Sequence, residues 1–180
     1  MKKLWLLLIA LCLISSCASA AYKRSLEDLP KSDFSVEIPD GWWKPQYINR
    51  YLITKDGAFN QYVLIQQRPI DRPFKKTGKK LRKGMLPLES SKIIVDEIAA
   101  DRNIMNFDLI ENSPATISGH AGFKILFSYR DKNGAEYKTL YYGFIRGDSF
   151  FNIRYSAARQ YYDKDLADFK RILNSFKLLK

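Results

Sequence analysis

Three segments in the second half of the chain are predicted to be strands, and short turns join them. Phe123–Arg130 has the two-residue period of a strand, and the segments Tyr137–Ile145 and Phe150–Ala157 follow it. Lys132-Asn133-Gly134 separates the first two segments, and Arg146-Gly147-Asp148-Ser149 separates the last two. Connections this short allow only antiparallel hairpins, because a parallel pair needs a crossover of a dozen or more residues. The sequence therefore predicts an antiparallel meander.

The remaining segments add strands and two helices to this meander. Further strands are predicted at 34–38, 47–54, 59–67 and 108–118, the last of them broken near Pro114. Helices are predicted over 88–102 and from about residue 163 onward, where apolar residues recur at spacings of three and four. Several strands carry apolar residues on both faces, so we expect helices to cover both. The expected fold is α+β: an antiparallel sheet of about six or seven strands flanked by helices in an α/β/α sandwich.

The order of these elements resembles that of the PsbP-like superfamily. Three motifs carry the resemblance: Pro39-Asp40-Gly41-Trp42, Ile117-Ser118-Gly119-His120-Ala121-Gly122 and Asn174-Ser175-Phe176-Lys177. The superfamily includes bacterial DcrB-like envelope proteins, the extrinsic photosystem II protein and a eukaryotic Ran-binding import factor. The resemblance covers about residues 33–180 and implies a binding or assembly protein rather than an enzyme. It implies no functional residues, because the matching positions are turns and core.

The N-terminus has the layout of a lipoprotein signal. Two lysines precede an apolar run, Leu4–Ile14, that is too short to remain in a bilayer as a spanning helix. Leu13-Ile14-Ser15-Ser16-Cys17 resembles a bacterial lipobox, so Cys17 is the expected lipidation site and first mature residue. The alternative is an ordinary signal peptide cut after Ala18-Ser19-Ala20.

Three regions follow from this interpretation: a signal peptide over 1–16, a lipidated cysteine with its tether over 17–32, and one domain over 33–180. A flexible tether of about 15 residues spans roughly 20 Å on average, so the domain should stay close to its membrane. Ala18 follows the cysteine where an aspartate would resemble an inner-membrane retention signal. We therefore expect a lipid-anchored protein of the cell envelope, on the periplasmic face of the outer membrane if the cell is Gram-negative.

Positive charge gathers in one irregular stretch of the chain. Lysine and arginine number 30 against 19 acidic residues, a net charge of +11, and most of this excess lies between Arg68 and Lys83. The surrounding segment 69–87 has no strand or helix period, and loops of this length in compact domains are usually functional or disordered. The candidate contacts for an anionic partner are Arg72, Lys75, Lys76, Lys79, Lys80, Arg82 and Lys83.

Two interpretations of this loop remain open. In the first, anionic head groups or an acidic envelope protein neutralise the cations, with Phe74, Leu81 and Met85 as interleaved apolar contacts. In the second, the loop is mobile and only keeps the protein soluble. A nucleic-acid partner is not expected for an exported chain.

Other candidate sites are few. Trp42 and Trp43 are adjacent, so an extended backbone should direct one into the core and leave Trp43 as a candidate surface contact. His120 is the only histidine, in a glycine-rich turn where it would tolerate an unusual backbone angle, and no aspartate lies nearby to orient it as a base. A single histidine also argues against a zinc site.

No catalytic pair stands out among the acidic residues Glu97, Asp101, Asp108 and Glu111. We therefore expect a non-enzymatic binding or assembly module for another envelope component, without cofactor or metal. The alternative is a small-ligand carrier or hydrolase that uses a pocket between sheet and helix. Two or more convergent carboxylates in a deep apolar cleft would favour that alternative.

Overall fold

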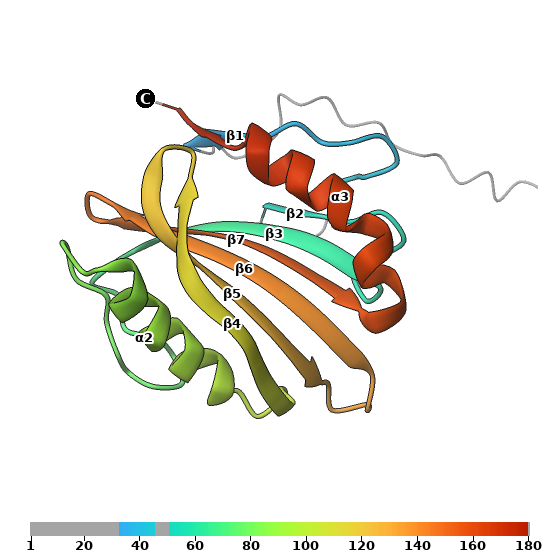
Figure 1. Ribbon diagram of the computed structural model, residues 1–180, viewed down its shortest axis with the longest axis horizontal. Helices are drawn as coiled ribbons and strands as arrows, with labels where there is room; N and C mark the ends of the chain where they lie inside the picture. Colours follow the sequence, from blue (N-terminus) through green and yellow to red (C-terminus); the bar gives the residue numbers. More distant parts are fainter. Residues whose placement is uncertain (1–32, 46–50, 180) are drawn as a thin grey trace, which may run out of the picture. The chain divides into compact units, whose positions relative to one another are not determined.

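The computed structural model describes residues 33–45 and 51–179 of the 180-residue chain (Figure 1). The expected signal peptide, Cys17 and the tether lie outside the described residues. The described elements are, in chain order, β1 (Phe34–Ser35), β2 (Tyr51–Ile53), β3 (Gln61–Pro69), α2 (Pro87–Ala99), β4 (Met105–Ile117), β5 (His120–Arg130), β6 (Glu136–Arg146), β7 (Ser149–Ala158), α3 (Arg159–Ser175) and β8 (Lys177–Leu178).

Six of these strands form one antiparallel sheet in the order β2-β3-β7-β6-β5-β4. The predicted meander is its centre, and the residues Leu126, Leu140 and Tyr155 lie opposite one another across β5, β6 and β7. Gly134 and Gly147 have φ values of 85° and 57° in the two turns, the left-handed conformation that tight hairpins require. The short strands β1 and β8 pair separately. An antiparallel sheet with helices on both faces confirms the predicted fold class.

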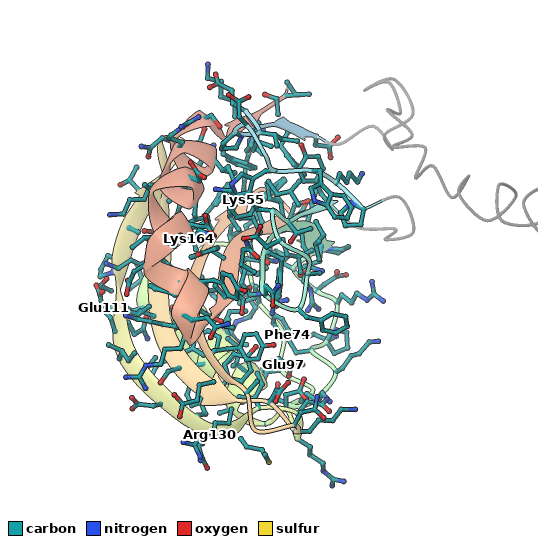
Figure 2. The ribbon with its side chains drawn as sticks, turned by 90° about the vertical axis from the view of Figure 1, so that its right-hand side faces the viewer. Lys55, Phe74, Glu97, Glu111, Arg130 and Lys164 are labelled. Carbon is teal, nitrogen blue, oxygen red and sulfur yellow. The ribbon has the colours of Figure 1, made fainter. Side chains whose placement is uncertain are left out.

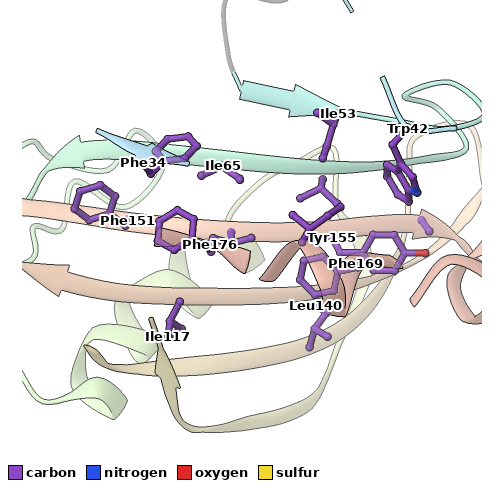
Figure 3. Close-up of a cluster of buried hydrophobic side chains, with 14 of the residues drawn as sticks. Phe34, Trp42, Ile53, Ile65, Ile117, Leu140, Phe151, Tyr155, Phe169 and Phe176 are labelled. Carbon is purple, nitrogen blue, oxygen red and sulfur yellow. The ribbon is translucent and has the colours of Figure 1, made fainter. Parts of the chain in front are cut away.

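Two apolar clusters pack on the two faces of the sheet. Figure 1 shows α3 and α2 on opposite sides of it. On one face α3 buries Tyr162, Phe169 and Ile172 against the strands. Phe34 of β1 belongs to the same cluster, and Figure 3 labels it together with Phe169. On the other face Ile94 of α2 packs in a cluster that includes the β5 residues Phe123, Ile125 and Phe127. The alternation along β5 therefore predicted its buried face correctly.

Two glycines let the central strands approach the packed side chains. A Cβ on Gly122 would lie 2.4 Å from the carbonyl oxygen of Gly143 and 2.6 Å from Ile117 Cδ1. A Cβ on Gly143 would lie 2.5 Å from the ring of Phe123 and 2.9 Å from that of Phe150. Both residues thus occur where no larger side chain fits.

The structure corrects the predicted break at Pro114. β4 continues through this residue, which lies opposite Phe123, and the register shifts occur earlier, between Met105 and Asp108 and between Leu109 and Glu111. Because β4 is an edge strand of the sheet, a proline that donates no hydrogen bond is tolerated there.

Several boundaries also differ from the prediction. The first strand was predicted over 34–38 but ends at Ser35, because its partner β8 offers only two residues for pairing. The second is Tyr51–Ile53, with residues 46–50 outside the described part. The last helix begins at Arg159, directly after β7 and about four residues earlier than expected, because the side chain of Tyr162 extends its buried face.

Candidate anionic-partner interface

Residues 70–86, here called the basic loop, connect β3 to α2 and fold onto the α2 face of the sheet. Ile70, Phe74 and Leu81 are buried there, with Phe74 8% and Leu81 2% exposed. Met85 is half-buried against the same cluster. The expectation that Phe74, Leu81 and Met85 offer apolar contacts to a partner is therefore wrong for the two buried residues. They anchor the loop instead.

A carboxylate of α2 fixes the middle of the basic loop. The two oxygens of Glu97 accept the backbone N–H of Lys76 at 3.0 and 3.1 Å. One of them also accepts the backbone N–H and the hydroxyl of Thr77, both at 3.0 Å. Figure 2 labels Glu97 of α2 and Phe74 of the basic loop. Glu97 thus satisfies polar groups of a segment that has neither helix nor strand to satisfy them.

Backbone bonds and one stacked arginine complete the fold of the loop. Phe74 N–H donates to Lys79 O at 2.8 Å, and Leu81 N–H donates to Ile70 O at 3.1 Å. The guanidinium of Arg68 lies 3.9 Å from the centre of the Phe74 ring and donates to the carbonyl oxygens of Arg72 and Pro73. Burial lowers the pKa of Arg68. Arg68 therefore supports the loop, and the charge available to a partner comes from other residues.

All seven candidate cations are exposed on this folded loop, but their surroundings differ. Three of them form ion pairs with acidic residues: Lys76 with Asp101 at 3.3 Å, Lys79 with Asp96 at 2.5 Å, and Lys83 with Asp148 at 3.8 Å. The other four, Arg72, Lys75, Lys80 and Arg82, form no ion pair within the described residues. These four are the cations best placed to meet an anionic partner.

The two tryptophans point in opposite directions, as predicted. Trp42 is buried and donates from Nε1 to Asp168 Oδ2 at 3.0 Å, whereas Trp43 is 50% exposed and donates to Lys55 O at 3.2 Å. Trp43 pairs with Thr54, beside the start of β3, whereas the basic loop follows the end of β3. Trp43 and the basic loop thus do not form one surface.

A buried polar cluster that the sequence analysis missed joins α3 to the turn between β2 and β3. The side chain of Asp165 is fully buried, and its two oxygens accept from Lys55 Nζ and Gln61 Nε2, each at 3.1 Å. The hydrogen bond that Lys55 donates to Asp165 raises the pKa of Lys55. Asp168 lies one turn later, and the hydrogen bond from Trp42 lowers its pKa. An aspartate in register with the apolar residues Tyr162, Phe169 and Ile172 was the available sequence signal.

His120 has a packing role. Its ring stacks on Phe144 with centroids 5.1 Å apart. The unusual backbone angles expected at His120 fall instead on Ser118 and Gly119, with φ values of 48° and 79°. No group of three or more metal-ligating side chains occurs within 33–45 and 51–179.

A cavity of about 490 Å³ lies at the far end of the meander, where the start of α3 meets β5 and β6. Its lining includes Ile110, Ser128, Arg130, Lys138 and Arg159 and a single carboxylate, Glu136. Glu136 pairs with Arg130 at 2.6 Å and with Arg159 at 2.9 Å, and these arginines lower its pKa. The cavity therefore lacks the convergent carboxylates that would favour a hydrolase. Elsewhere Glu97, Asp101 and Glu111 each bind a neighbouring residue of the fold.

Comparison with solved structures identifies proteins of similar fold. LpqN of Mycobacterium tuberculosis, involved in cell envelope biogenesis, aligns at a TM-score of 0.60 and 13% identity over 82% of this chain and 83% of its own. Cyanobacterial PsbP (CyanoP) from Synechocystis aligns at a TM-score of 0.54 and 12% identity, over 92% of this chain and 99% of its own. The domain has the PsbP-like fold. The Ran-binding protein Mog1p of Saccharomyces cerevisiae has a similar fold, with a TM-score of 0.54 and 7% identity over 82% of this chain and 91% of its own.

These identities establish the PsbP-like fold and no more. No protein-family model and no curated protein sequence matches the chain. Among the helices of the described part, none is long and apolar enough to cross a membrane.

Proposed function

We propose that this protein is a non-enzymatic, lipid-anchored envelope protein whose PsbP-like domain binds or assembles another envelope component. The observation that carries the proposal is the basic loop, where Arg72, Lys75, Lys80 and Arg82 are exposed and have no acidic partner among residues 33–45 and 51–179. Exposed like charges held near one another repel, so an anionic partner lowers the energy of this arrangement. Anionic head groups and an acidic envelope protein both have the required chemistry.

The way in which the loop is held favours binding over simple solubility. A loop that served only to carry charge would need no buried Phe74 or Leu81 and no Glu97 to bind its backbone. Because these residues order the loop before any partner arrives, less conformational entropy is lost on binding. The fold relatives agree with this class of function, since LpqN is involved in envelope biogenesis and Mog1p binds Ran.

Removal of three of these four cations should weaken the proposed contact. We expect the triple variant Lys75→Gln, Lys80→Gln and Arg82→Gln to lose at least tenfold in cross-linked partner recovered from membranes, at about 1 kcal/mol per charge near an anionic surface. The measurement is quantitative cross-linking of intact cells followed by mass spectrometry. Three exposed lysines outside the loop provide a control of equal charge: Lys132→Gln, Lys170→Gln and Lys177→Gln. If the loop variant keeps every cross-linked partner and every liposome contact of the wild type, the loop has no role in binding.

The anchor makes a separate prediction. The Cys17→Ala variant should remain an unprocessed and unacylated precursor, because the sulfur that carries the lipid is gone. Two or three acyl chains hold a protein almost permanently, whereas one chain holds it only marginally. Mass spectrometry of the mature N-terminus provides the measurement. A wild-type product that begins after Cys17, or normal membrane retention of the variant, would contradict lipid anchoring.

A further inference from the structure

Two exposed leucines follow the cations of the basic loop. Leu86 is 64% exposed and Leu88 is 44% exposed, although both belong to the segment that opens α2. A turn places Leu86 close to Arg82, since Met85 N–H donates to Arg82 O at 3.3 Å and Gly84 has a φ of 78°. Apolar and cationic side chains thus share one exposed tip of the domain.

The position of Leu86 is fixed by the helix rather than by burial. Leu86 is the N-cap residue of α2; its N–H donates to Glu89 Oε2 at 3.1 Å, and its carbonyl accepts from Ser90 N–H at 3.0 Å. Serine, threonine, aspartate and asparagine are the residues that normally cap a helix. A leucine at this position gives up a side-chain cap and presents an apolar group to solvent, which is a feature of surfaces that meet an apolar phase.

The tip lies at the same end of the sheet as the start of the domain. Phe34 of β1 contacts Phe176, and Phe176 contacts Phe144, which is two residues from the end of β6. The turn that follows β6 contains Asp148, the partner of Lys83 in the basic loop. The chain therefore enters the described domain near the β6–β7 turn, and the basic loop touches that same turn from the other face.

We propose that Lys80, Arg82, Leu86 and Leu88, here called the docking patch, bind the anionic bilayer surface to which the lipid anchor holds the protein. This inference rests on the proposed function and names its partner. The cations meet the phosphates of the head groups, and the leucines enter the boundary between head groups and acyl chains. A bilayer fits better than an acidic protein because its surface offers phosphates to the cations and an apolar boundary to the exposed leucines Leu86 and Leu88, whereas acidic side chains would satisfy only the cations.

The test uses the full acylated chain in vesicles, where the anchor holds the protein whether or not the patch docks. A nitroxide is attached at Leu88→Cys; in the mature protein the only other sulfhydryl position, Cys17, is acylated. The probe membranes are phosphatidylethanolamine with a quarter phosphatidylglycerol, and phosphatidylcholine alone. A nitroxide at Lys132→Cys, in the turn at the other end of β6, is the matched control.

The nitroxide at residue 88 should be at least threefold less accessible to a water-soluble relaxant in the anionic vesicles than in the neutral ones. The nitroxide at residue 132 should be equally accessible in both. Salt at about 1 M should remove the difference, because the screening length falls from about 10 Å to about 3 Å. Adding Leu86→Ser should lower the docked-to-undocked ratio by about tenfold, the effect of losing one buried leucine side chain.

Equal accessibility of residue 88 in the two vesicles overturns the docking patch. If the triple glutamine variant still loses a cross-linked protein in cells, the partner is that protein and the proposed function stands. If that variant loses nothing, the proposed function falls as well. Protection at residue 88 that survives both high salt and the triple variant also overturns the proposal, because the cations would then contribute nothing.

Discussion

Replacement of Gly122 by alanine is expected to destabilise the domain by about 3 kcal/mol or more, the upper range for overpacking a core. The new Cβ would lie 2.4 Å from the carbonyl oxygen of Gly143, which belongs to the neighbouring central strand. A backbone atom in a paired strand cannot turn away as a side chain can. The Cβ would also meet Ile117 Cδ1 at 2.6 Å and Phe144 Cβ at 2.8 Å, so β4 and β6 would both have to shift.

Denaturant unfolding of purified protein measures this loss. Ala121→Ser, at the exposed neighbouring position of β5, is the control and should change the free energy of unfolding by less than about 0.5 kcal/mol. Native domains are stable by only about 5–15 kcal/mol, so the Gly122→Ala variant is expected to show a much lower midpoint or poor soluble expression. A midpoint equal to that of the control would mean that the strands separate more easily than their packing indicates.

The Asp165→Ala variant is expected to lose about 3 kcal/mol of stability. Breaking a buried ion pair costs about 3–5 kcal/mol, and the lower end applies because the side chain of Lys55 is 30% exposed and can regain water. The buried amide of Gln61 loses its hydrogen bond to Asp165 and keeps only the bond to Asp56 at 3.2 Å. The loss should loosen α3 from the β2–β3 turn.

Asp163→Ala provides a matched control on the same helix, since Asp163 is exposed. Unfolding in urea should separate the two variants by at least 2 kcal/mol, given the 3–5 kcal/mol expected for a buried pair. Hydrogen exchange at α3 should also rise in Asp165→Ala at temperatures where both proteins are folded. Equal stability of the two variants would show that the Lys55–Asp165 pair only offsets the cost of its own burial.

The sequence predicted the centre of the fold well because the information there is local. Short turns with glycine at left-handed positions join β5, β6 and β7, and the apolar residues of β5 recur with a period of two. The start of α3 was missed because Ala158 and Arg159 carry no capping signal. Pro114 was misjudged because tolerance of proline depends on which strand lies at the edge, and no local pattern shows that order.

The candidate site was predicted only in part. The density of lysine and arginine located the basic loop, but buried residues of a loop have no periodicity, so nothing distinguished Phe74 and Leu81 from exposed contacts. Which cations are already paired depends on Asp96, Asp101 and Asp148, which approach only after folding. The exposure of Leu86 was equally hidden, since an apolar residue at a helix start usually packs inward.

The strands of the sheet separate the docking patch from the cavity. β6 has 11 residues, so its two ends are roughly 34 Å apart at about 3.4 Å per residue. The docking patch and the start of the domain lie around one end, and the cavity lined by Arg130, Glu136 and Arg159 lies at the other. In a domain docked as proposed, the strands would run away from the bilayer. The cavity would then face the aqueous compartment and be open to molecules that diffuse through it.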